Sequence, residues 1–139
     1  MFQIELLGER LVQAVAWARG RGDIGALRLG LFGASTGAGG ALLAAVQRPD
    51  DVRAVVSRGG RPDLAGSALP RVRAPTLLLV GGADTEVLAL NRQALVHLEC
   101  EKRLDVVPGA THLFEEPGTL EQVADLAGDW LLRHLQAAG

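Results

Sequence analysis

Hydrophobic positions along the chain follow two spacings, one typical of helices and one typical of strands. Near the start, apolar side chains recur every three or four residues, which predicts an amphipathic helix over residues 3–19. Short apolar runs that end near glycine or proline follow, and such runs are typical of strands. They lie at residues 27–32, 52–57, 75–82 and 103–108. The run at 75–82 is almost wholly apolar, which predicts a strand covered on both faces, as in a parallel sheet.

Helical spacing returns between these strands. Residues 35–47 and 86–98 predict two helices, and a last helix begins at Thr119, where Thr119 and Gln122 form a T-x-x-Q capping box. The one long connection, residues 58–75, predicts a loop with a short helical turn near its middle. Because strands alternate with helices, the pattern predicts an α/β fold with a parallel four-stranded sheet flanked by helices.

Composition and charge fit one globular domain over residues 1–139. Hydrophobic residues make up 48% of the chain and charged residues 22%, which excludes a disordered protein. The formal net charge of -2 gives no reason to expect a nucleic-acid partner. The first residues mix acids into their apolar run, unlike a signal peptide, and no uncharged apolar run reaches the roughly 18 residues of a membrane span.

The chain has a single cysteine, Cys100, which cannot form an internal disulfide. This favours a reducing compartment, so we expect a cytoplasmic protein. The sequence contains neither a CxxC pair nor an HExxH motif, and we therefore expect no metal and no cofactor.

The sequence G-A-S-T-G at residues 33–37 matches the G-x-S-x-G motif and lies between a predicted strand and a predicted helix. In that position the motif forms a sharp turn that exposes the serine hydroxyl, so Ser35 is a candidate nucleophile. We expect Gly33 and Gly37 to remove Cβ atoms that would clash where strand and helix meet. The backbone N–H of Thr36, at the start of the helix, is then placed to donate to an oxyanion.

Two simpler interpretations of this turn compete with catalysis. The serine can serve only as a helix cap, because G-x-S-x-G alone is a weak signal. Glycines before a helix also bind phosphate, but the chain has neither G-x-G-x-x-G nor G-x-x-x-x-G-K-[ST].

A serine nucleophile needs a base, and the base needs an acid that orients it. Asp84 follows the strand at 75–82, and His112 follows the strand at 103–108. Parallel strands end at one edge of the sheet, so both side chains are expected near Ser35, in the order Ser, Asp, His that α/β-hydrolases use. Asp84 as a mere helix cap and Asp63 as the acid are the alternatives.

Three further residues are expected near this edge. Arg58 and Arg61 follow the second strand and are candidates for holding a substrate carboxylate, because a guanidinium binds carboxylates through two hydrogen bonds. The alternative is that these arginines pair with nearby acids such as Asp63. Phe114 follows His112 and either lines the substrate pocket or anchors its loop.

The segments around these residues, from "LGLFGASTGAGGALLAA" to "LDVVPGATHLFEEPGTLEQVADLAGDWLLRHL", resemble the C-terminal half of an α/β-hydrolase. The resemblance is to the dienelactone-hydrolase-like group, which includes domains fused to phosphoribosyltransferases. It implies Ser35 as nucleophile, Asp84 as acid and His112 as base. Dienelactone hydrolases proper use cysteine as nucleophile, so the serine implies ester hydrolysis in general.

The resemblance also implies a shortened fold, because members of the family usually have eight strands and only the last four are expected here. The loop that supplies the second oxyanion donor in this family then has no counterpart. We expect a serine esterase acting on small esters with short acyl chains. The alternatives are an inactive domain that serves as a scaffold, or a thioesterase or lactonase with the same three residues. The strand at 27–32 becomes an exposed sheet edge, which predicts a homodimer or larger assembly.

Overall fold

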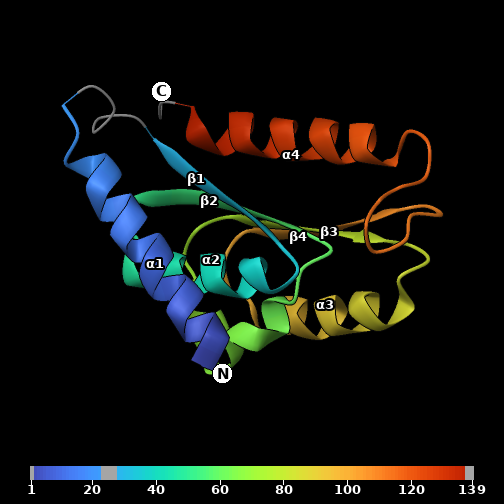
Figure 1. Ribbon diagram of the computed structural model, residues 1–139, viewed down its shortest axis with the longest axis horizontal. Helices are drawn as coiled ribbons and strands as arrows, with labels where there is room; N and C mark the ends of the chain where they lie inside the picture. The colour runs from blue at the N-terminus through green and yellow to red at the C-terminus, as the bar shows by residue number, and fades with distance from the viewer. Residues whose placement is uncertain (1, 23–27, 137–139) are drawn as a thin grey trace.

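The computed structural model of the chain describes residues 2–22 and 28–136 (Figure 1). Helices and strands alternate along the chain as the hydrophobic pattern predicts. Their order is α1 (Phe2–Arg19), β1 (Leu29–Ala34), α2 (Thr36–Gln47), β2 (Val52–Arg58), the 3₁₀ segment η1 (Pro62–Arg71), β3 (Thr76–Gly81), α3 (Thr85–His97), β4 (Lys102–Val107) and α4 (Thr119–Leu135).

The strands form a four-stranded, wholly parallel sheet in the order β1-β2-β3-β4. Helix α4 covers one face of the sheet, and α1, α2 and α3 lie on the other (Figure 1). All six residues of β3 are buried, which its continuous apolar sequence requires of a strand packed on both faces. The predicted fold class is therefore confirmed.

Side chains alternate between the two faces of each strand and so feed two cores. In β2, Val55 packs with α2, η1 and α3, whereas Ala54 and Val56 face α4 and contact Trp130 and its neighbours. Because the sheet is parallel, the carboxyl ends of all four strands lie along one edge. At this edge Arg58 pairs in register with Ala34 of β1 and with Leu79 of β3.

The structure changes three details of the predicted elements. The first strand runs to Ala34, two residues further than expected, while residue 27 lies outside the described range. The connection after β2 is ten residues of 3₁₀ helix with a kink at Gly66, rather than one short turn. The capping box at Thr119 is absent, because Gly118 holds the N-cap position and the Thr119 hydroxyl instead donates to the carbonyls of Phe114 and Glu116.

None of the helices in the described ranges combines the length and the apolar character that crossing a membrane demands.

Candidate active site

Ser35 lies on the turn between β1 and α2 with a strained backbone, at φ 50° and ψ −127°. A Cβ on Gly33 would lie 2.7 Å from the backbone N and Cα of Ala38 and from the carbonyl oxygen of Gly37. Glycine is therefore required at position 33, where the strand and the helix almost touch. The same expectation for Gly37 is wrong, because a Cβ there meets nothing within 4 Å.

The structure brings Ser35, His112 and Asp84 into one chain of hydrogen bonds. Ser35 Oγ lies 2.9 Å from His112 Nε2, and His112 Nδ1 lies 2.9 Å from Asp84 Oδ2. A carboxylate only accepts hydrogen bonds, so Nδ1–H donates to Asp84 and Nε2 accepts from the Ser35 hydroxyl. The Ser35 hydroxyl makes no helix-capping bond, so the cap interpretation does not describe it.

The ends of β3 and β4 position Asp84 and His112. The N–H of Ala83 donates to the carbonyl of Ala110 at 3.0 Å, which ties the turn that carries Asp84 to the loop that carries His112. A Cβ on Gly81 would overlap the Ala110 carbonyl, so this approach depends on glycine. Asp84 occupies the N-cap position of α3 without capping it, and its carboxylate contacts His112 instead.

Asp63, the alternative acid, is bound to an arginine, whereas Asp84 contacts His112. Arg61 donates two hydrogen bonds to it, Nε to Oδ1 at 3.0 Å and Nη2 to Oδ2 at 2.9 Å. The hydrogen bond to Asp63 raises the pKa of Arg61, so the guanidinium stays charged and held. Of the two arginines weighed for substrate binding, Arg61 is thus the one engaged by a neighbouring acid.

Arg58 is the last residue of β2, and its guanidinium lies over the ring of Phe114. Its guanidinium carbon lies 5.7 Å from the centre of the Phe114 ring, on the α4 side of the sheet. Its Nε is buried and has no hydrogen-bond partner. Phe114 is itself buried, with φ at 55°, so its ring lies beneath Arg58 and anchors the His112 loop.

Thr36 is the first residue of α2, and its side chain is exposed. The first N–H groups of a helix have no partner inside the helix, so this donor is free to point at an anion beside Ser35. The carbonyl of Ser35 accepts hydrogen bonds from Arg61 N at 2.9 Å and from Ala38 N at 3.2 Å, and these two bonds hold the backbone of the turn.

One feature of the site was not predicted from the sequence. The carboxylate of Glu116 accepts hydrogen bonds from the backbone N–H and the hydroxyl of Thr111, the residue before His112. The hydrogen bond from the Thr111 hydroxyl lowers the pKa of Glu116 most, and the bond from the Thr111 N–H lowers it further. No pattern in the sequence marks this pair, because both residues lie in an irregular loop without periodic spacing.

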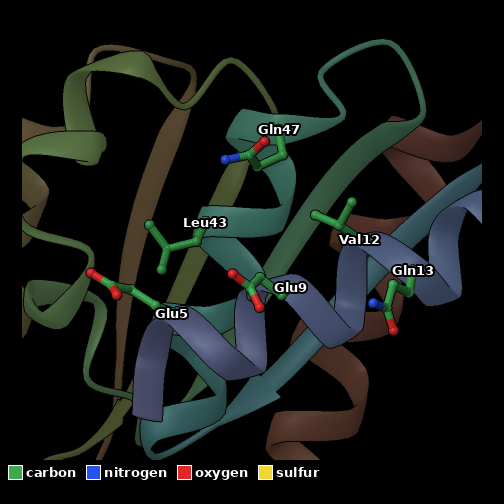
Figure 2. Close-up of a pocket in the computed structure, with 7 residues that line it drawn as sticks. Glu5, Glu9, Val12, Gln13, Leu43 and Gln47 are labelled. Atoms are coloured by element: carbon green, nitrogen blue, oxygen red, sulfur yellow. The ribbon is translucent and has the colours of Figure 1, made fainter. Parts of the chain in front are cut away.

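A groove lies between α1 and α2, and Ser35 does not line it. It measures about 460 Å³ and is lined by residues that include Glu5, Glu9, Leu43 and Gln47 (Figure 2). In residues 2–22 and 28–136, no group of three or more His, Cys, Asp or Glu side chains is arranged to hold a metal ion.

Comparison with known proteins identifies relatives of two kinds. Residues 3–136 match the dienelactone hydrolase family. A crystal structure of dienelactone hydrolase from Anabaena variabilis superposes with a TM-score of 0.95 and 57% identity, covering 97% of this chain and 62% of that one. A putative phosphoribosyl transferase of Mycobacterium tuberculosis is 58% identical over all 139 residues, which make up 31% of its length.

More distant structures share the fold alone. A monoacylglycerol lipase from Paleococcus ferrophilus has a TM-score of 0.73 at 20% identity, covering 91% of this chain and 76% of that one. The chain spans less than two thirds of the Anabaena protein and about a third of the curated relative. With the family match over nearly its whole length, the chain belongs to the dienelactone hydrolase family.

Proposed function

We propose that the chain is a serine hydrolase that cleaves carboxylic esters. The observation that carries the proposal is the pair of 2.9 Å contacts that link Ser35 Oγ, His112 and Asp84. A nucleophile in contact with a base, and a base in contact with an acid, is the arrangement that activates a serine hydroxyl. Membership of a hydrolase family supports the same reaction class.

In the proposed reaction, His112 Nε2 takes the proton of Ser35 as Oγ attacks the carbonyl carbon of the ester. The oxyanion that forms accepts a hydrogen bond from the N–H of Thr36, at the positive end of α2. The tetrahedral intermediate collapses, and His112 returns the proton to the departing alcohol. Water then attacks the acyl-serine with His112 again as base, which releases the acid and restores Ser35.

Asp84 acts in this scheme through His112. Its carboxylate holds the imidazole with Nε2 facing the serine, and it stabilises the imidazolium that forms when His112 takes the proton. The side chain of Asp84 is 16% exposed and that of His112 is 42% exposed, so solvent reaches the base while the acid is largely covered.

Arg58 is the residue we propose for contact with a charged substrate. Within the described residues, no acid is recorded beside its guanidinium, whereas Arg61 is held by Asp63. An ester that carries a carboxylate would complete the hydrogen bonding of Arg58.

Two further properties belong to this proposal. The preference for a short acyl chain stays a prediction. The free thiol of Cys100 is the basis for proposing a reducing compartment such as the cytoplasm.

The direct test compares hydrolysis of p-nitrophenyl acetate and butyrate by the wild type and by Ser35→Ala. We expect kcat/KM to fall by about 10³-fold or more in Ser35→Ala, because the nucleophile is lost. Ser67→Ala is the matched control, since Ser67 is exposed on η1 and lies outside the site. Equal rates for the wild type and Ser35→Ala would refute the esterase proposal.

Comparing oxoesters with thioesters and cyclic esters separates the alternatives that share the same three residues. A thioesterase would hydrolyse an acyl thioester faster than the oxoester of equal acyl length. A lactonase would prefer a cyclic ester, and an inactive scaffold would hydrolyse none of these substrates above background.

A further inference from the structure

The loop between β4 and α4 carries His112, and its first half is tied to the sheet. Ala110 N donates to the carbonyl of Val107 at 3.3 Å, and Ala110 O accepts from Ala83 N at 3.0 Å. These bonds fix the chain just before Thr111. The direction of the His112 side chain then depends on how the next residues are held.

Glu116 holds that part of the loop from the other side. Its Oε1 accepts from Thr111 N at 2.9 Å, and its Oε2 accepts from Thr111 Oγ1 at 2.7 Å. Both carboxylate oxygens therefore bind one residue, the immediate neighbour of His112. The two bonds join Thr111 to Glu116 and so close residues 111–116 into a hydrogen-bonded ring, of which His112 is a member.

Helix α4 anchors this ring. Thr119 N donates to the carbonyl of Glu116 at 3.1 Å, and the Thr119 hydroxyl shares its one proton between the carbonyls of Phe114 and Glu116, at 2.9 Å and 2.8 Å. Phe114 N donates to the carbonyl of Thr111 at 3.1 Å, and its ring is buried in the core beneath α4. The carboxylate of Glu116 thus connects the first turn of α4 to the backbone beside His112.

We propose that Glu116 is a positioning residue for His112, acting through its two hydrogen bonds to Thr111. The inference rests on the proposed function, in which His112 is the base for Ser35. Glu116 contacts neither Ser35 nor His112 Nε2 in this role. It limits the rotation of the backbone that carries the imidazole and so keeps Nε2 at hydrogen-bonding distance from Ser35 Oγ.

The chemistry of the carboxylate explains why glutamate suits this position. It accepts two hydrogen bonds at once, one from an N–H and one from a hydroxyl, and both are strengthened by its charge. A glutamine is neutral and has one acceptor oxygen, so it can accept from the Thr111 N–H but can keep the hydroxyl contact only by donating to it, and both bonds lose the strengthening of the charge. The adjacent Glu115 is exposed, and no hydrogen bond to its side chain is recorded in the described part of the chain, so it provides a matched control.

The test measures kcat and KM for a p-nitrophenyl ester in five single variants, which are Glu116→Ala, Glu116→Gln, Thr111→Val, Thr111→Ser and Glu115→Ala. We expect kcat to fall about 10-fold in Glu116→Ala and about 3-fold in Glu116→Gln, with KM changed by less than about 2-fold. Thr111→Val should lower kcat, Thr111→Ser should retain it, and Glu115→Ala should match the wild type.

The double variant Glu116→Ala/Thr111→Val distinguishes loss of one shared contact from a general loosening of the loop. If the two residues act through one contact, the double variant has about the kcat of Glu116→Ala alone. Multiplied losses would overturn the proposal, and so would a kcat for Glu116→Ala equal to that of Glu115→Ala.

Amide hydrogen exchange at Thr111 keeps this test separate from the test of the esterase. We expect exchange to speed up in Glu116→Ala and to remain unchanged in Glu115→Ala. If the wild type has no esterase activity, the proposed function fails on its own. Equal exchange at Thr111 in both variants would refute the bond between Glu116 and the loop directly.

Discussion

Two residues other than glycine have a positive φ in the described part of the chain. Ser35 belongs to the hydrogen-bonded site, and Phe114 follows His112 by two residues. Such conformations cost free energy and persist only where the surroundings enforce them. At Ser35 the enforcing contacts are the bonds from Arg61 N and Ala38 N to its carbonyl. At Phe114 they are the buried ring and the hydroxyl of Thr119.

Substitution of the turn glycines separates steric need from sequence pattern. Gly33→Ala places a Cβ against backbone atoms that cannot move aside, so we expect the free energy of unfolding to fall by about 2 kcal/mol or more. Gly37→Ala adds a Cβ in open space within α2, so we expect stability to be unchanged or to rise by up to about 1 kcal/mol. Urea denaturation measures both, and equal effects would contradict this account of the turn.

The choice of acid gives a second prediction. Asp84→Asn removes the charge in contact with His112, and if Asp84 is the orienting acid, as we propose, kcat falls by about 10³-fold or more. Asp63→Asn changes an acid at the same edge that is bound to Arg61, and we expect kcat to change by less than about 3-fold. Steady-state kinetics on one ester measures both variants. A larger loss in Asp63→Asn would make Asp63 the orienting acid.

At this scale the sequence predicts most of what the structure brings together. Ser35, Asp84 and His112 were located by their positions after strand ends, because parallel strands place such residues at one edge. The contact between Glu116 and Thr111 was not predicted, since it depends on the path of an irregular loop. The environment of Gly37 was misjudged because the motif does not say which Cβ position faces the strand.

At the scale of elements, one cluster of charges fastens the corner where α1, α2 and β2 meet. Asp51, just before β2, accepts from Arg19 at the end of α1 at 2.9 Å and from Arg48 after α2 at 2.7 Å. The hydrogen bond from Arg48, together with that from Arg19, lowers the pKa of Asp51, although partial burial opposes the shift.

The lowered pKa of Asp51 predicts a dependence of stability on pH. The contribution is fully present above the pKa that aspartate has in the unfolded chain, about 3.9, and is lost as the pH falls through the lower pKa of the folded state. We expect Asp51→Asn to lower the free energy of unfolding by roughly 1 kcal/mol at pH 7, since both ion pairs are partly exposed. Urea denaturation at pH 7 and pH 3 checks this, and a difference of equal size at both pH values would contradict it.

The helices and strands can be predicted from the hydrophobic pattern, because the face that each element buries determines where its apolar residues stand. β3 is recognisable because it is almost wholly apolar, and α4 because one face packs on the sheet. The start of α4 was predicted with the wrong cap, since Gly118 in a left-handed conformation and the bonds of the Thr119 hydroxyl depend on the preceding loop. The kinked 3₁₀ segment after β2 likewise lacks a periodic signal.

At the scale of the whole molecule, β1 forms one edge of the sheet in the part of the chain that the structure describes. Its residues are uncharged, and Phe32 is 52% exposed. Leu131 and Leu135 of α4 pack over Gly30, and with Leu132 they line an apolar groove of about 350 Å³. An apolar edge without charges tends to pair with another strand, and we propose that a second copy of this chain pairs with it.

This proposal predicts that the chain self-associates at micromolar concentration. Phe32→Lys adds a charge at the edge at little cost to the core, and we expect it to shift the chain to monomer in sedimentation velocity. Val96→Lys is the control, because Val96 is 75% exposed on α3 and lies away from the β1 edge, on the face of the sheet opposite α4. A wild type that sediments as a monomer would contradict the proposal.

The central claim is that Ser35 is an activated nucleophile. Mass spectrometry of the protein after reaction with a fluorophosphonate tests this most directly, because the reagent bonds covalently to a serine only where a base activates it. We expect a single adduct on the peptide that contains Ser35, no adduct in Ser35→Ala, and slower labelling in His112→Ala. An unlabelled wild type, under conditions that fully label a known serine esterase, would contradict the account, as would an adduct that persists in Ser35→Ala.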